Sequence, residues 1–390
     1  MNRRKERQSN IELLRIITAL GVIILHYNNP NIGGGFRNVS GNANMLIMAF
    51  FQAVFVCAVN LFILISGYFM RHSKKRDLLK PVELLSQLLI FEILFILIKE
   101  LPSGKAISGE TILGYFRPSY WFVFVYVALY LISPYINIMW DVLKEKDTKV
   151  LLIVMLGCFS IYPIIIDMAS YISTLEMSGM GTVGLDGSQA GYTIVNFVIM
   201  YLIGLYIRDK DEERERGLNS NSENFDKENS DVEKSNGGKS DCSDKHKSTI
   251  FPWLIINILL ILIWSILDQT VFNRHTGLIP AWAYMNPLVI TEAILFFLLF
   301  RRMKIKNNKV INELAAASFP SYLIHINLLG YFNIEKFVQG NPGILFLHII
   351  GCAVIIYLIS FILLKIYQLI TKPLFKAIDN KWKKCRKYEL

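Results

Sequence analysis

Long apolar stretches follow one another along almost the whole chain and are separated by shorter polar segments. Most of them approach the roughly 20 residues that an α-helix needs to cross a bilayer. The pattern predicts ten spans, at residues 11–28, 45–70, 81–99, 120–140, 149–167, 191–208, 250–272, 283–301, 314–332 and 343–371. We therefore expect an all-α integral membrane protein with about ten transmembrane helices. The first span carries charged residues and lacks a small-x-small cleavage site, so we do not interpret it as a cleaved signal peptide.

One polar segment, 209–248, differs from the rest because it is rich in Asp, Glu, Lys, Asn and Ser. Such a composition has too few apolar side chains to order itself, which predicts a disordered, charged cytoplasmic linker. The predicted organisation is therefore a cytoplasmic tail at 1–10, spans one to six within 11–208, the linker at 209–248, spans seven to ten within 249–371, and a basic cytoplasmic tail at 372–390.

The charge distribution predicts the orientation in the membrane. The chain has a formal net charge of +10, is 53% hydrophobic and has a mean hydropathy of +0.40. Lys and Arg gather at both ends and in the loops near 71–80 and 301–309, whereas 168–190 contains none. This positive-inside pattern predicts a multi-pass protein of the cell (inner) membrane with both termini in the cytoplasm. The basic excess then follows from topology, and the expected partner is the lipid bilayer rather than nucleic acid.

The five cysteines are scattered, and no pair has the spacing of metal ligands or of a redox motif. We therefore expect neither a metal site nor a disulfide.

Ionisable residues in the first span are the strongest candidates for function. Arg15 and His26 are eleven residues apart, which places them on nearly the same helix face about 16 Å apart along the axis. Glu12 precedes Arg15 by three residues. Because ionisable side chains within a membrane usually face a protein interior or a wet cavity, this arrangement predicts a polar track. The alternative is that Arg15 snorkels to the inner interface while His26 lies at the outer one.

These residue types suggest a division of chemical roles. A neutral imidazole such as that of His26 can accept a proton from a hydroxyl group. Arg15 and Arg71 are both expected near the cytoplasmic side, where two guanidiniums could hold phosphates by bidentate contacts. Arg71 also opens the basic run 71–76, which topology alone explains.

Four motifs in order resemble the membrane-bound acyltransferase 3 family. They are NIELLR at 10–15 followed by His26, FILISGYFMR at 62–71, YWF at 120–122 with LISP at 131–134, and SFPSYLIH at 318–325. The resemblance extends from residue 10 to about residue 369. One departure is Glu12, where many relatives have Asp, and this keeps the charge.

The resemblance implies transfer of an acyl group, usually acetyl, from cytoplasmic acyl-coenzyme A to a hydroxyl of a cell-surface or lipid-linked glycan. Acyl-CoA would be a donor substrate, and no bound cofactor is expected. His26 would act as general base in a direct attack on the thioester, with Glu12 orienting Arg15. His325 could serve as oxyanion donor, acceptor ligand or second base.

Further residues have two interpretations each. Ser66 could contact the donor or form an acyl-enzyme, but Gly67 beside it is also typical of closely packed helices. Tyr322, one turn from His325, could contribute a hydroxyl. Trp121 and Tyr120 could stack on a sugar ring, and aromatic residues of a membrane interface fit the pattern equally well.

A transporter or flippase for a glycan or a small polar solute is the alternative function. Ten spans with internal charges fit that class too. Transporters often carry interrupted segments at corresponding places in two halves, and this sequence has no such pair. The sequence sets neither the acyl group, nor the sugar, nor the oligomeric state.

Overall fold

The computed structural model describes residues 7–100, 102, 108–110, 120–172, 189–228, 242–271 and 280–386. Every regular element in these ranges is a helix, so the predicted all-α class is confirmed there. Eight segments within them are long and apolar enough to cross a membrane: Ser9–Asn28, Asn42–Met70, Leu79–Lys99, Trp121–Val142, Glu145–Ile166, Thr249–Thr270, Pro280–Arg301 and Pro342–Ile378. The chain is therefore a multi-pass membrane protein.

Several of these spans are built from more than one element. The helices are α1 (Ser9–Asn28), α2 (Gly35–Asn38), α3 (Asn42–Phe55), α4 (Ala58–Met70), α5 (Leu79–Glu100), α7 (Trp121–Val142), α8 (Glu145–Leu156), α9 (Tyr162–Ile172), α10 (Ile194–Glu228), α11 (Cys242–Thr270), α12 (Pro287–Arg301), α13 (Lys309–Leu314), α14 (Ser318–Leu329), α15 (Ile334–Val338) and α16 (Pro342–Arg386). Short 3-10 turns at Gln189–Gly191, Pro280–Trp282 and Ala315–Ala317 and a π-turn at Gly157–Ile161 complete the order. The predicted span 45–70 is thus two helices, α3 and α4.

Two predicted spans are shorter than the others. Span 191–208 corresponds to the first part of α10, whose apolar stretch ends before Arg208. Span 314–332 corresponds to the alanine turn Ala315–Ala317 followed by α14, which has only 12 residues. Neither meets the length and hydropathy of a full crossing. A total of ten spans therefore stays a prediction.

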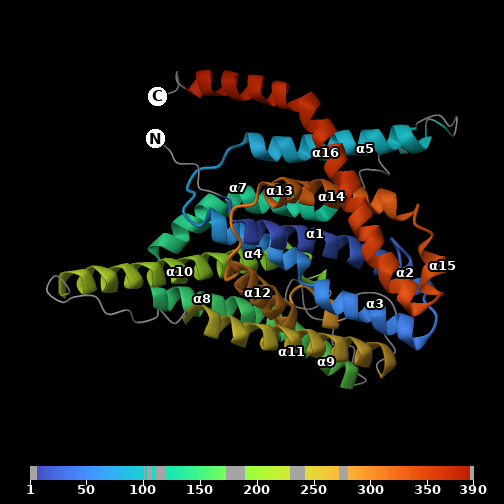
Figure 1. Ribbon diagram of the computed structural model, residues 1–390, viewed down its shortest axis with the longest axis horizontal. Helices are drawn as coiled ribbons and strands as arrows, with labels where there is room; N and C mark the ends of the chain where they lie inside the picture. The colour runs from blue at the N-terminus through green and yellow to red at the C-terminus, as the bar shows by residue number, and fades with distance from the viewer. Residues whose placement is uncertain are drawn as a thin grey trace.

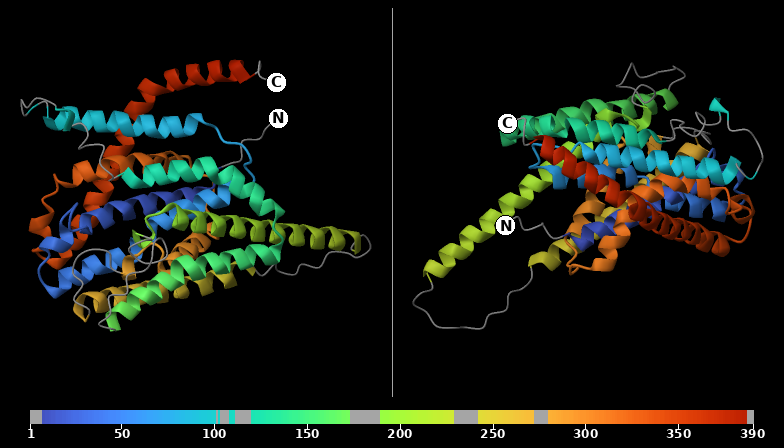
Figure 2. Two further views of the ribbon diagram at one scale, coloured as in Figure 1. Left: turned by 180° about the vertical axis from the view of Figure 1, so that it is seen from behind. Right: turned by 90° about the horizontal axis from the view of Figure 1, so that it is seen from above.

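The long helices run roughly side by side, and α1 lies inside the assembly (Figure 1). It packs against α3, α4, α14 and α16. The two ends of the chain lie at the same end of the helices in both side views, with α2 and α15 at the opposite end (Figures 1 and 2). The polar residues of α1 consequently face other helices, as expected for ionisable groups in a membrane protein.

Small residues allow α4 and α10 to cross closely. A Cβ on Gly67 would lie 2.3 Å from the backbone oxygen of Tyr201, and one on Gly204 would lie 2.4 Å from that of Leu64. Neither position can hold a side chain without separating the helices. The packing interpretation of the glycine after Ser66 is therefore confirmed.

The start of the predicted linker is ordered. Asp209 and Asp211 lie on α10 and form ion pairs, Asp209 with Arg71 at 2.7 Å and Asp211 with Arg301 at 2.6 Å. The structure describes helix as far as Glu228 and again from Cys242, and residues 229–241 lie outside the described residues. A linker can therefore begin only after these ion pairs, and its disorder stays a prediction.

Candidate active site

Two histidines from distant parts of the sequence meet in the centre of the fold. His26 lies near the end of α1 and His325 lies in α14. Their ring centroids are 4.5 Å apart, with the rings edge to face at 64°. His325 is fully buried and His26 is partly buried. The sequence predicted comparable depths for the two rings, and the structure places them in direct contact.

The hydrogen bonds of both rings fix which nitrogen carries the proton. His26 Nδ1 lies 2.8 Å from the carbonyl oxygen of Val22, and His325 Nδ1 lies 3.0 Å from that of Ser321. A carbonyl oxygen can only accept, so each Nδ1 must carry the hydrogen. In a neutral ring Nε2 then presents a lone pair. No hydrogen bond to a described residue occupies Nε2 of His325. The pair is thus oriented to accept a proton from a third group.

This geometry narrows the roles of His325. A neutral imidazole that donates through Nδ1 has no second hydrogen to offer from Nε2. To stabilise an oxyanion, His325 would have to be doubly protonated at the moment when His26 has also taken up a proton as the base. Repulsion between the two charged rings disfavours this role. A second base or an acceptor ligand fits the observed bonds better.

A cavity of about 480 Å³ lies between α1, α4, α5, α7 and α14, and its lining includes Tyr322 but neither histidine. On α1 it is lined by Arg15 and Val22, which are about 10 Å apart along the helix axis. His26 is one turn beyond Val22. The cavity thus follows α1 from Arg15 as far as Val22, and a continuous polar track from Arg15 to His26 stays a prediction.

Arg15 is held in place by Glu12. Arg15 Nη1 lies 3.2 Å from Glu12 Oε1, and Glu12 itself is buried. The guanidinium also lies 5.8 Å from the centroid of the Phe69 ring, which lines the same cavity. The expected contact between Glu12 and Arg15 is confirmed. Since Arg15 keeps about a third of its side chain exposed, it can contact a ligand in the cavity.

Ser66 also lines this cavity. Its hydroxyl donates to the carbonyl oxygen of Phe62 at 2.8 Å and lies 3.3 Å from the hydroxyl of Tyr126. Neither group can act as a base toward serine, so this arrangement does not favour an acyl-enzyme. Ser66 is placed to contact the contents of the cavity.

The structure separates Arg71 from Arg15. Arg71 lines a different cavity, where it binds Asp141 at 2.5 Å and Asp209 at 2.7 Å. Burial by itself would lower the pKa of this guanidinium, but the two carboxylates outweigh burial and raise it. Because both its neighbours are anionic, Arg71 links the ends of α4 and α7 to the middle of α10. Arg15 and Arg71 line different cavities, so the described structure does not support their predicted pairing at one phosphate site.

The aromatic candidates differ in their surroundings. Tyr322 lines the cavity, and its ring centroid is 5.8 Å from that of His325. Tyr120 is only 4% exposed and packs edge to face on Tyr322, so it offers no free face to a sugar. Trp121 is partly buried against Tyr192 and Tyr284, with centroids 4.7 and 6.2 Å away. Tyr120 is therefore better described as a positioning residue.

Glu92, which the sequence analysis missed, supports Tyr120 from α5. The Tyr120 hydroxyl donates to Glu92 Oε1 and lies 3.2 Å from the carbonyl oxygen of Leu323. Glu92 is 1% exposed. A carboxylate in the middle of an apolar span was a signal of the same kind as Arg15. Lys80, Glu83, Tyr126 and Tyr130 also line the cavity, and nothing in their local sequence singled them out.

The comparison with protein families matches residues 8–365 to an acyltransferase domain. The protein belongs to the acyltransferase 3 family. The match covers all four motifs and both members of the His26–His325 pair of this acyltransferase. No curated protein and no solved structure matches the chain.

Proposed function

We propose that this membrane acyltransferase moves an acyl group, acetyl in the first instance, from cytoplasmic acyl-CoA to a hydroxyl of a cell-surface or lipid-linked glycan. The observation that carries the proposal is the contact of His26 with His325, which lies about one helical turn beyond Val22 and Tyr322 of a cavity that Arg15 also lines. Membership of the acyltransferase 3 family supports the reaction class.

In this proposal the donor enters with its thioester arm in the cavity. Arg15 and Lys80 are cations lining the cavity, and they suit the diphosphate of coenzyme A. The remaining lining is mostly aromatic and aliphatic, including Phe62, Phe69 and Phe122. Such walls suit a thin, weakly polar pantetheine arm and keep water from the thioester.

The chemical step uses Nε2 of His26 as the base. Nε2 takes the proton of the acceptor hydroxyl while that oxygen bonds to the thioester carbonyl carbon. The tetrahedral intermediate collapses by breaking the carbon–sulfur bond. The leaving thiolate of coenzyme A then takes the proton from His26, which returns the ring to its neutral form. The Nδ1–H bond to Val22 holds the ring in the required tautomer throughout.

The test measures ester-linked acetate in the envelope of cells that express wild type, His26→Ala or His72→Ala, with all three proteins quantified in the membrane. His72 is an exposed histidine that pairs with Glu212 and serves as the matched control. We expect acetate with wild type and His72→Ala, and a loss of about 10²-fold or more with His26→Ala. Equal acetate from wild type and empty vector would contradict the proposal and favour the transporter alternative.

A further inference from the structure

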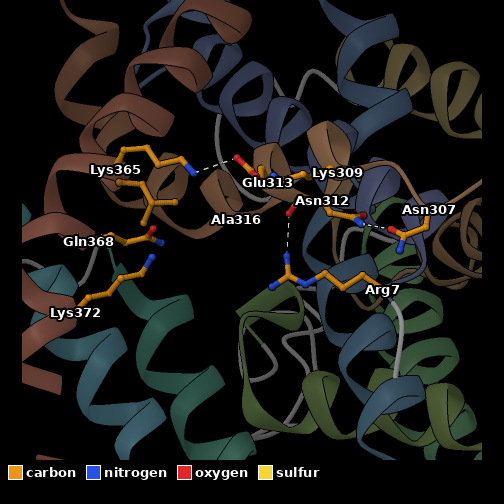
Figure 3. A pocket seen from close by; sticks show the side chains of 10 residues that line it. Arg7, Asn307, Lys309, Asn312, Glu313, Ala316, Lys365, Gln368 and Lys372 are labelled. Atoms are coloured by element: carbon orange, nitrogen blue, oxygen red, sulfur yellow. Dashed lines mark hydrogen bonds and ion pairs between the residues drawn. The ribbon is translucent and has the colours of Figure 1, made fainter. Parts of the chain in front are cut away.

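A second cavity, of about 590 Å³, lies beside the first and is strongly basic (Figure 3). Its cationic lining consists of Arg7 before α1, Lys309 on α13, and Lys365 and Lys372 on α16. The single carboxylate in the lining belongs to Glu313, which is 3.4 Å from Lys365 Nζ. Four cations against one carboxylate leave an excess of positive charge that suits a multiply charged anion.

Two of these lysines are available to a ligand. Lys309 and Lys372 are exposed, and neither forms an ion pair with any residue that the structure describes. Arg7 donates to the backbone carbonyl of Asn312 at 2.8 Å, which fixes its guanidinium without neutralising it. In Figure 3 the side chain of Lys372 extends from α16 toward Arg7 on the opposite wall. An anion between these walls would reach cations from both.

The rest of the lining suits a nucleoside rather than a bare anion. Asn312 Nδ2 donates to Asn307 Oδ1 at 2.6 Å (Figure 3), which leaves the amide hydrogens of Asn307 and the whole Gln368 amide to contact a ligand. Such amides match the ribose hydroxyls and the ring nitrogens of an adenine base. A simple inorganic anion would use only the cations.

The two cavities meet at Ala316, which lines both. Ala316 is the central residue of the Ala315–Ala317 turn, whose side chains are single methyl groups. From Ala316 to His325 is nine residues, about 13 Å at a helical rise. A pantetheine arm, comparable to four or five extended residues, spans about 15 Å. One ligand can therefore place a charged head in the basic cavity and a thioester near the histidines.

We propose that the basic cavity binds the 3′-phosphorylated adenosine end of the acyl-CoA donor. This inference rests on the proposed function and adds the part of the donor that Arg15 and Lys80 leave unassigned. The 3′-phosphate would lie against Lys309 and Lys372, and Arg7 would close the opposite wall. Phosphate–ammonium contacts of this kind are charge-assisted and therefore among the stronger hydrogen bonds.

The test compares the affinities of coenzyme A and 3′-dephospho-coenzyme A for the purified full-length protein in a neutral detergent. We expect wild type to prefer coenzyme A by about tenfold or more, which is the effect of about 1.4 kcal/mol. The Lys309→Ala/Lys372→Ala double variant should lose this preference and bind both ligands equally, with unchanged affinity for dephospho-coenzyme A. Both lysines are exposed, so the variant should fold normally. Lys149→Ala, an exposed lysine paired with Glu145 on α8, is the matched control.

An anionic lipid headgroup offers the same phosphate chemistry to this cavity. The measurement is therefore repeated in nanodiscs of phosphatidylcholine with and without phosphatidylglycerol. A preference for coenzyme A that persists in the double variant, together with lysine-dependent retention of phosphatidylglycerol, would overturn the proposal in favour of lipid. An equal affinity of wild type for the two coenzymes would also overturn it. If wild type bound coenzyme A but transferred no acyl group, the proposed function would fail while this site would stand.

Discussion

The imidazole of His26 lies edge to face on that of His325, with ring centroids 4.5 Å apart, and each ring donates its Nδ1 hydrogen to a carbonyl one turn earlier in its own helix. The two backbone carbonyls thus act as fixed orienting groups, a role that a carboxylate often fills elsewhere. Each ring is oriented by a carbonyl of its own helix, so its orientation needs no further residue. The contact between the two rings depends in addition on the packing of α1 against α14.

Replacing His325 tests whether His26 or His325 is the general base. We expect His325→Ala to lower the rate of acyl transfer by about 10²-fold with little change in the KM for acyl-CoA, since His325 does not line the donor cavity. Wild-type activity should fall at low pH because a protonated imidazole cannot accept the hydroxyl proton. The pH profile of His325→Ala should keep this acid limb. Loss of the limb would assign the base to His325 instead of His26.

Removing the guanidinium of Arg15 tests donor binding. We expect Arg15→Ala to raise the KM for acyl-CoA about tenfold or more, and Glu12→Gln to raise it less, because Glu12 acts only by holding Arg15. Steady-state kinetics with acetyl-CoA measure both effects. Arg216, which is 80% exposed on α10, provides the control through Arg216→Ala. An unchanged KM in Arg15→Ala would exclude Arg15 from the donor site.

The hydroxyl of Tyr120 is predicted to matter for stability. Tyr120→Phe would leave the buried Glu92 carboxyl without this donor, which costs about 1–3 kcal/mol. The temperature of unfolding in detergent should therefore drop. Tyr135→Phe, on α7, which begins directly after Tyr120, concerns a side chain that is 74% exposed and should leave the unfolding temperature unchanged. Equal stability of the two variants would show that Glu92 is satisfied by other groups.

The close crossing of α4 and α10 predicts a steep cost for a single methyl group. Gly67→Ala puts a Cβ 2.3 Å from the Tyr201 carbonyl oxygen and should destabilise the protein by at least about 1–3 kcal/mol. Gly351 on α16 has nothing within 4 Å of the added carbon. Gly351→Ala should therefore be neutral or stabilising by up to about 1 kcal/mol. The unfolding temperatures of the two variants test this prediction. If Gly67→Ala unfolded at the wild-type temperature, α10 would have to be able to shift away from α4.

Arg71 should behave as a structural residue. Arg71→Ala would remove the cation shared by Asp141 and Asp209, leaving Asp141 with Lys74 and Asp209 with the Trp140 indole, so we expect lower stability by about 1–3 kcal/mol. The KM for acyl-CoA in the folded fraction should stay within about twofold of wild type. An increase in KM as large as that of Arg15→Ala would return Arg71 to the donor site.

The sequence by itself determined what depends on local composition and spacing. Apolar run lengths predicted the eight segments that are long and apolar enough to cross a bilayer, because the bilayer thickness fixes how many residues a crossing helix needs. The spacing of Glu12, Arg15 and His26 gave their common face, since helical geometry relates these residues whatever surrounds them. The motif resemblance also predicted the family that the match over residues 8–365 confirms.

Only the tertiary structure decided which residues from different helices meet. The sequence predicted that Arg15 and Arg71 lie together near one side of the membrane. In the fold, Arg15 lines the cavity between α1, α4, α5, α7 and α14, whereas Arg71 pairs with Asp141 and Asp209. The contact of His26 with His325, the burial of Tyr120 against Glu92 and the meeting of two cavities at Ala316 depend likewise on how helices cross. These crossings are set by side-chain packing between segments far apart in the chain, which no local pattern encodes.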